Sequence, residues 1–131
     1  MSLTSFVHLA AQVDGLHHWP DAPPSEEYLR APHRHLFVVT ADIEVDGHDR
    51  DIEINTAARW LTALLPSLAE PDPGGLLDFG RHSCEHLAAR ITEAIRDRYG
   101  RHRRIRCTVL EDGILGAGVT WHPDPQSEPG A

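Results

Sequence analysis

The feature that most constrains the fold of this chain is a change in the spacing of its apolar residues. In the middle of the chain they recur every three or four positions, which places them on one face of a helix. Two stripes have this spacing: Leu61, Leu64, Leu65 and Leu68, and then Leu87, Ala88, Ile91, Ala94 and Ile95. Near the C-terminus, Ile105, Cys107 and Val109 instead alternate with polar residues, as in a half-buried strand. The sequence therefore predicts two central helices followed by strands.

Turn and capping residues divide the chain into the order ββααββ. We expect strands over residues 4–13, 35–45, 103–111 and 114–121, with a proline-containing loop over 18–32. Asn55 and Ser83 are good N-cap residues, so the helices are expected to start after them. Pro66 and Gly100 are expected near the helix ends.

This order predicts an α+β fold, a four-stranded antiparallel sheet with two helices on one face. Asp112 and Gly113 are expected to form the hairpin turn between the last two strands. We expect one domain over residues 1–122, and a flexible tail over 123–131 because that segment has three prolines and no apolar pattern.

Composition excludes several classes of protein. A formal net charge of −8 disfavours binding to nucleic acid or an anionic membrane, which both need a basic surface. The chain has no apolar run near the ~18–20 residues of a membrane span, and its N-terminus lacks the pattern of a signal peptide. Two cysteines are too few for a disulfide scaffold, so we expect a cytoplasmic protein with free thiols.

Three histidines have the spacing of metal ligands. His33 and His35 open the second strand, where side chains two residues apart point to the same face. His17 follows the first strand, which antiparallel pairing would bring alongside, whereas His8 and His18 are substitutes. Three imidazoles leave one tetrahedral position open, the pattern of a catalytic zinc, although nickel, cobalt or iron also accept such ligands. Zinc there would support proton abstraction next to a carbonyl or hydrolysis, and spacing does not choose between them.

Four segments resemble, in order and spacing, motifs of one known family. They are His17, then His33-Arg34-His35, then Ser83-Cys84-Glu85-His86-Leu87-Ala88, then Val109-Leu110-Glu111. The chain is similar to 6-pyruvoyltetrahydropterin and 6-carboxytetrahydropterin synthases over about residues 5–120. The resemblance implies the tunnelling fold, a homo-oligomer built as a ring of sheets, commonly a hexamer, and Zn²⁺ on the three histidines. It also implies that Glu111 binds the amino-amide edge of a pterin through two hydrogen bonds.

The chain departs from this family at the residues that transfer protons. Arg34 replaces the glycine between the family's two histidines, and the preceding loop lacks the family's cysteine base. Since one branch of the family uses glutamate there, Glu27 or Glu26 is a candidate base. A solvated loop glutamate is the alternative for both residues.

The family's Asp-His motif before the second helix is also absent. Asp78 and His82 could re-create it from other positions, because a carboxylate can hold an acid–base histidine in one tautomer. The alternative is that Asp78 caps a turn and His82 is exposed. Cys84 lies at a helix start, where a thiol is acidified, but a buried packing residue is the interpretation we favour.

Together these features predict a zinc-dependent lyase that acts on a dihydroneopterin-type substrate. Zn²⁺ would be held by His17, His33 and His35, and Glu111 would anchor the ring. Two alternatives stay open. The same scaffold could act on another heterocycle or a nucleoside in specialised metabolism, or the chain could be a non-catalytic metal- or ligand-binding protein.

Overall fold

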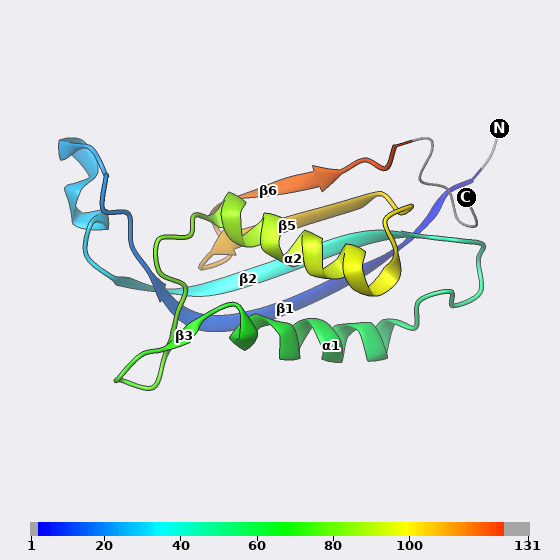
Figure 1. Cartoon of the computed structure of the whole chain (residues 1–131), viewed down its shortest axis with the longest axis horizontal. Helices are drawn as coiled ribbons and strands as arrows, with labels where there is room; N and C mark the ends of the chain where they lie inside the picture. The colour runs from blue at the N-terminus through cyan, green and yellow to red at the C-terminus, as the bar shows by residue number, and fades with distance from the viewer. Residues whose placement is uncertain (1–2, 125–131) are drawn as a thin grey trace.

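The computed structural model describes residues 3–124, which form one mixed sheet and two main helices (Figure 1). The elements are β1 (Ser5–His17), the 3₁₀ helix η1 (Pro24–Leu29), β2 (His33–Val45), α1 (Ile54–Ser67), β3 (Glu70–Pro71), β4 (Leu77–Asp78), α2 (Cys84–Tyr99), β5 (Ile105–Glu111) and β6 (Leu115–Trp121). The strand order in the sheet is β3-β4-β1-β2-β5-β6. Neither main helix is long and apolar enough to cross a membrane within the described range.

The predicted α+β class is confirmed, but the strand count was wrong. The sheet has six strands rather than four, because β3 and β4, of two residues each, were not predicted. It is also not fully antiparallel, since β4 pairs parallel to β1 at Gly15–Leu77 and Leu16–Asp78. Two residues are too few to show the apolar alternation of a strand. β3 and β4 are strands only because β4 pairs with β1 and β3 pairs with β4. Residues 125–131 of the predicted tail lie outside the described residues.

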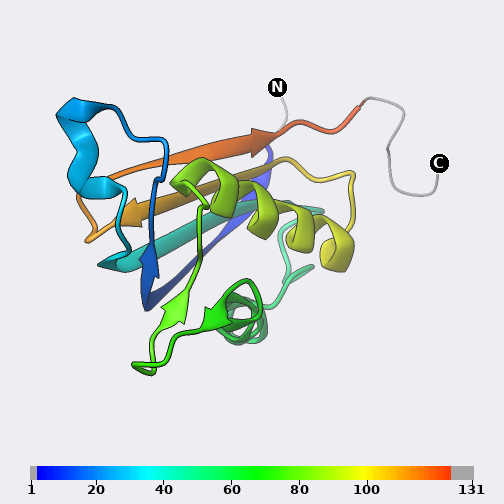
Figure 2. The ribbon, with the colours of Figure 1, turned by 60° about the vertical axis from the view of Figure 1, so that its left-hand side comes forward.

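Both helices pack on the same face of the sheet, as expected (Figure 2). The core residues from the strands are Leu9, Phe37, Val39, Ala41, Ile43, Ile105, Cys107 and Val109, and those from the helices include Leu61, Leu65, Leu87, Ile91 and Ile95. On β2 every second residue from Phe37 to Ile43 is buried, which is the alternation of a sheet covered on one face. The apolar stripes of the two helices thus pack against the inward-facing side chains of the sheet.

The helix starts agree with the sequence at α2 and differ at α1. The Ser83 hydroxyl accepts a hydrogen bond from the His86 backbone N–H at 3.1 Å, so the predicted cap is confirmed. The prediction of Asn55 as the cap of α1 was wrong. Glu53 caps α1 instead, because its carboxylate accepts hydrogen bonds from the backbone N–H groups of Asn55 and Thr56.

The β1–β2 pairing is longer than the sequence indicates. β1 continues to His17 rather than ending at residue 13, and β2 begins at His33 rather than His35. The extension passes through Gly15, which is buried. A Cβ atom at Gly15 would lie 2.6 Å from the Phe79 ring, so the missing side chain lets Phe79 pack against β1. The end of β1 thus forms a strand through its pairing with β2 and its packing against Phe79, and not through the strand propensity of its own residues.

A buried arginine ties the loop after α2 to the loop before α1. Arg103 is 7% exposed, and its Nε donates to the Tyr99 carbonyl at 2.7 Å. Its Nη1 donates to the Glu44 carbonyl at 3.1 Å and to Asp51 Oδ2 at 2.5 Å. The hydrogen bond from Arg103 to Asp51, followed by one from the Asp46 backbone N–H, holds the pKa of Asp51 below its usual value.

We expect the Asp51→Asn substitution to lower the free energy of unfolding by about 1–3 kcal/mol, because it removes the nearer counter-charge of the buried Arg103 guanidinium and leaves only Asp46, at 4.0 Å. Urea denaturation at pH 7 measures this change. Since folding lowers the pKa of Asp51, its contribution is complete above the unfolded pKa of about 3.9 and is lost as pH falls through the folded value. Asp49→Asn is the control, because Asp49 pairs with Arg50 in solvent and should change nothing. Equal stability of the two variants would contradict the assignment.

Candidate metal centre

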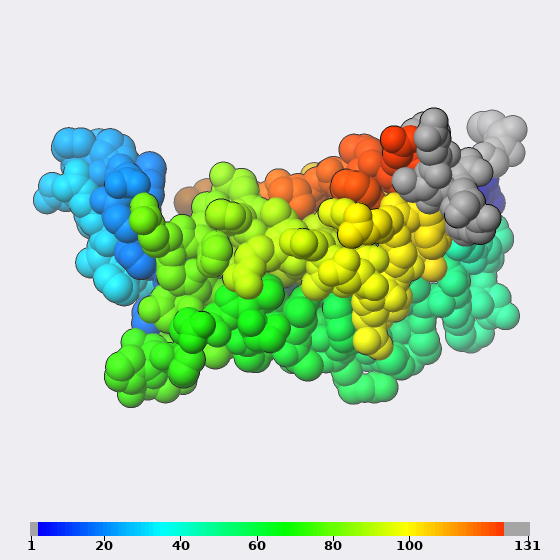
Figure 3. Space-filling view, in the orientation of Figure 1, coloured from blue at the N-terminus to red at the C-terminus, as the bar shows by residue number. Residues whose placement is uncertain are grey.

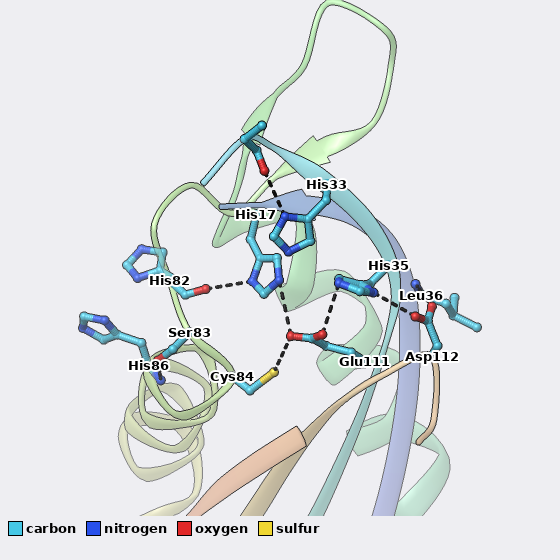
Figure 4. Close-up of polar contacts among 11 residues, drawn as sticks. His17, His33, His35, Leu36, His82, Ser83, Cys84, His86, Glu111 and Asp112 are labelled. Carbon is cyan, nitrogen blue, oxygen red and sulfur yellow. Dashed lines mark hydrogen bonds and ion pairs between the residues drawn. The ribbon is translucent and has the colours of Figure 1, made fainter. Parts of the chain in front are cut away.

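His17, His33 and His35 meet at one end of the helix-covered face of the sheet (Figure 4). His17 lies directly opposite His33 in the β1–β2 register, and His35 follows two residues along β2. The ring centroids are 4.6 Å apart for His17–His33, 5.4 Å for His17–His35 and 5.0 Å for His33–His35. One candidate ligand atom from each histidine lies within 4.8 Å of the others. The predicted grouping of the three histidines is therefore present.

Each of the three imidazoles is oriented by a hydrogen bond from its Nδ1 atom. The acceptors are the His82 carbonyl for His17 at 3.1 Å, the Ala31 carbonyl for His33 at 2.9 Å, and Asp112 Oδ2 for His35 at 2.8 Å. Carbonyl and carboxylate oxygens can only accept, so the proton of each neutral ring is on Nδ1. Each Nε2 therefore has a free lone pair, which is the arrangement found in metal-bound histidines.

The three histidines fit a divalent transition metal. Tetrahedral zinc with Zn–N bonds of about 2.0–2.1 Å holds its nitrogen ligands about 3.3 Å apart. In the described structure the three candidate ligand atoms lie within 4.8 Å of one another, so a bound ion would draw them closer together. Burial lowers the pKa of His17 and outweighs its hydrogen bond to His82 and the Glu111 charge, which raise the pKa. His17 is thus held neutral, as a ligand must be.

Glu111, predicted to bind substrate, lies against the histidines. Its Oε1 is 3.3 Å from His17 Nε2, and its Oε2 is 3.1 Å from His35 Nε2. The Cys84 thiol donates to Oε1 at 3.6 Å. Burial, with a smaller effect of the Glu111 charge, raises the pKa of Cys84 to about 12, so Cys84 is a protonated thiol. Cys84 also packs in the core, as the interpretation we favoured requires.

Asp112 is a site residue that the sequence analysis assigned only to a turn. Its carboxylate holds His35 and also accepts from the Leu36 backbone N–H at 2.9 Å. Its backbone N–H donates to the Leu36 carbonyl at 2.7 Å, and its φ of +56° is in the left-handed region that aspartate tolerates. The hydrogen bond from His35, followed by that from Leu36, lowers the pKa of Asp112. The sequence signal for this role is an acidic residue in the Asp112-Gly113 turn. It becomes informative once β5 is paired with β2, because the turn then lies beside the start of β2.

The predicted base Glu27 lies on η1, away from the histidines. Its side chain is 71% exposed and forms an ion pair with Arg30 at 4.0 Å. Glu26 in the same helix interacts with the exposed Tyr28, whose pKa it raises through a hydrogen bond. This segment projects beyond the end of the sheet (Figure 1). Leu29, the last residue of η1, lines the cleft that also contains His17 and His33, but Glu27 does not line it. A catalytic role for Glu27 stays a prediction.

The other two acid–base candidates, Asp78 and His82, are not hydrogen-bonded to each other in the described structure. Asp78 Oδ1 accepts from the Gly80 backbone N–H at 2.7 Å, as a residue that caps a turn does. His82 Nε2 lies 3.3 Å from Arg90 Nη1, and burial, with the charges of Arg90 and His86, lowers its pKa. In Figure 4 the His82 carbonyl points to His17 while its ring points away.

A cleft of about 410 Å³ is lined by two of the three histidines, His17 and His33, and by Glu111. One wall comes from the segment between β1 and β2, including Trp19 and Leu29, and the other from the start of α2, including Ser83 and Glu85. Figure 3 shows the first wall as a lobe at the end of the molecule, next to the start of α2. Such a volume is within the range of small-molecule sites. A larger hollow of about 610 Å³ lies at the far end of β1, without any of the three histidines.

Comparison with known proteins does not assign the chain to a family. No known protein family matches the sequence. No curated protein matches it either. The argument for function therefore depends on the geometry of the site, and the pterin synthase resemblance stays a prediction.

We expect the Asp112→Asn substitution to lower zinc affinity about 10- to 100-fold, the usual effect of losing an outer-sphere carboxylate. Asparagine tolerates the left-handed backbone of this turn but cannot supply the charge that holds His35 with its proton on Nδ1. Competition with a chromogenic chelator measures the affinity. Asp42→Asn is the matched control, since it removes a carboxylate 2.6 Å from His8 at the other end of β2. A loss of equal size in both variants would refute the role of Asp112.

Proposed function

We propose that this chain is a metal-dependent enzyme in which Nε2 of His17, His33 and His35 binds a divalent ion, with zinc as the first candidate. The observation that carries the proposal is the set of three Nδ1 hydrogen bonds to acceptors, which leaves three lone pairs at one place. A zinc ion bound there would polarise a hydroxyl or carbonyl group, or lower the pKa of a bound water to about 7.

The substrate we propose is a dihydroneopterin-type heterocycle, and the reaction a lyase reaction that yields a 6-carboxy- or 6-pyruvoyl-type pterin. The order of the sequence motifs supports this choice. The cleft has the volume for a bicyclic ring, and the half-exposed Trp19 in its wall offers an aromatic face for stacking. Glu111 and Glu85 also line the cleft, where a carboxylate can accept two hydrogen bonds from the amino-amide edge of a pterin.

The proton-transfer group is drawn from Glu27, Asp78 and His82, of which only His82 lines the cleft. A non-catalytic metal-binding protein is the second candidate function. It is favoured by one observation: in the described structure, none of these three side chains makes a hydrogen bond to a ligand imidazole. Turnover separates the two candidates.

Purified protein is expected to bind about one zinc ion per chain, because the three histidines form one site. His33→Ala and His35→Ala should each remove most of this zinc, measured by mass spectrometry of the metal after dialysis. His8→Ala is the control, since His8 lies on β1 far from the site and pairs with Asp42. Unchanged zinc content in both ligand variants would show that the metal site is wrongly placed.

We further expect the zinc-loaded protein to convert dihydroneopterin triphosphate. Chromatography of the fluorescent pterin products measures this turnover. His35→Ala should lose this activity together with its zinc, because the proposed reaction needs the metal to polarise the substrate. Stoichiometric zinc without turnover would exclude this substrate. It would then support a different heterocycle or the non-catalytic function.

A further inference from the structure

The Glu111 carboxylate faces two imidazole nitrogens that carry no proton when the rings are neutral, because the Nδ1 atom of each ring already faces an oxygen acceptor. Its oxygens lie 3.3 Å from His17 Nε2 and 3.1 Å from His35 Nε2. Both rings already have their proton on Nδ1, where it is donated to His82 and Asp112. His35 Nε2 is buried and makes no hydrogen bond to any described residue, although the Glu111 oxygen is close enough for one.

The neutral rings and Glu111 thus bring hydrogen-bond acceptors together, two Nε2 atoms and a carboxylate, with no proton between them. With both rings neutral, two nitrogen lone pairs and a carboxylate repel one another in a site where His17 is buried. Among the described residues, the close polar neighbours of the Glu111 carboxylate are these two Nε2 atoms and the neutral Cys84 thiol, which donates a hydrogen bond to Oε1. A cation between the nitrogens and the carboxylate would turn the repulsion into attraction.

We propose that Glu111 is the fourth protein ligand of the metal, so that the centre is His₃Glu rather than His₃. This inference rests on the proposed metal site and adds a role for Glu111 in the substrate-free protein. Ligand atoms around tetrahedral zinc are about 3.3 Å apart. Each Glu111 oxygen lies about that far from one nitrogen: Oε1 is 3.3 Å from His17 Nε2, and Oε2 is 3.1 Å from His35 Nε2. The Cys84 thiol donates a hydrogen bond to Oε1, as outer-sphere groups do to a carboxylate that binds a metal.

A fourth protein ligand closes the coordination sphere when no substrate is bound. A substrate oxygen can then reach the metal only by replacing Glu111 or by raising the coordination number to five. Replacement would free the carboxylate beside the substrate, where Glu111 could accept hydrogen bonds from the ring. The centre would thus exchange one oxygen ligand for another, with no change in oxidation state.

The test compares wild type with E111Q, and with E85Q as the control. Glu85 lines the same cleft from the start of α2, so its substitution removes the same charge without touching the histidines. Calorimetric titration with Zn²⁺ should show at least about a 10-fold loss of affinity for E111Q, since even outer-sphere partners contribute that much. The visible absorption of the Co²⁺-substituted protein should change in E111Q and stay that of wild type in E85Q.

The outcomes separate this inference from the proposed function. If wild type binds no zinc, the metal site itself fails. If wild type binds zinc and E111Q matches it in affinity and Co²⁺ spectrum, only the role of Glu111 fails. A crystal structure of zinc-loaded wild type needs no variant: a Glu111 oxygen at about 2.0–2.2 Å from zinc supports the proposal, and one beyond about 3 Å overturns it.

Discussion

The antiparallel pairing of β1 with β2 is the constraint on which the rest of the structure depends. Thirteen residue pairs join the two strands, from Ser5–Val45 at one end to His17–His33 at the other. Along most of this length the inward side chains build the core beneath the helices. At its end the same face presents the three histidines. A slip of one residue in β2 would turn His33 and His35 to the helix-free face and leave His17 alone, so packing of the core also sets the metal site.

The orientation of the three imidazoles depends on acceptors from three separate segments of the chain. The hydrogen bonds that orient the imidazoles come from the β1–β2 connection at Ala31, the turn before α2 at His82, and the β5–β6 hairpin at Asp112. Two of these acceptors are backbone carbonyls, whose positions follow from the fold rather than from residue type. The parallel pairing of β4 with β1 brings the chain back beside His17 and so places the His82 carbonyl.

The same long-range arrangement explains which predictions were right. The helical stripes, the Ser83 cap and the Asp112-Gly113 turn depend on neighbours within a few residues, so they could be predicted. β3, β4 and the extension of β1 to His17 depend on partners elsewhere in the chain. At α1 the local rule itself was misapplied, because Glu53 accepts the N–H groups that we assigned to a cap at Asn55.

The sequence by itself determined that His33 and His35 share a face and that His17 could join them, because the two-residue period of a strand and the pairing of consecutive strands are local properties. For His17 and His35, only the tertiary structure decided which nitrogen faces an acceptor, since those oxygens lie 65 and 77 residues away along the chain, whereas the acceptor for His33 is two residues away. It also decided that Glu111 lies beside the Nε2 atoms of His17 and His35. In the described structure, the side chains of Glu27, Asp78 and His82 make no hydrogen bond to the three imidazoles. Side-chain direction and hydrogen-bond partners depend on packing between distant segments, which no local pattern of residues encodes.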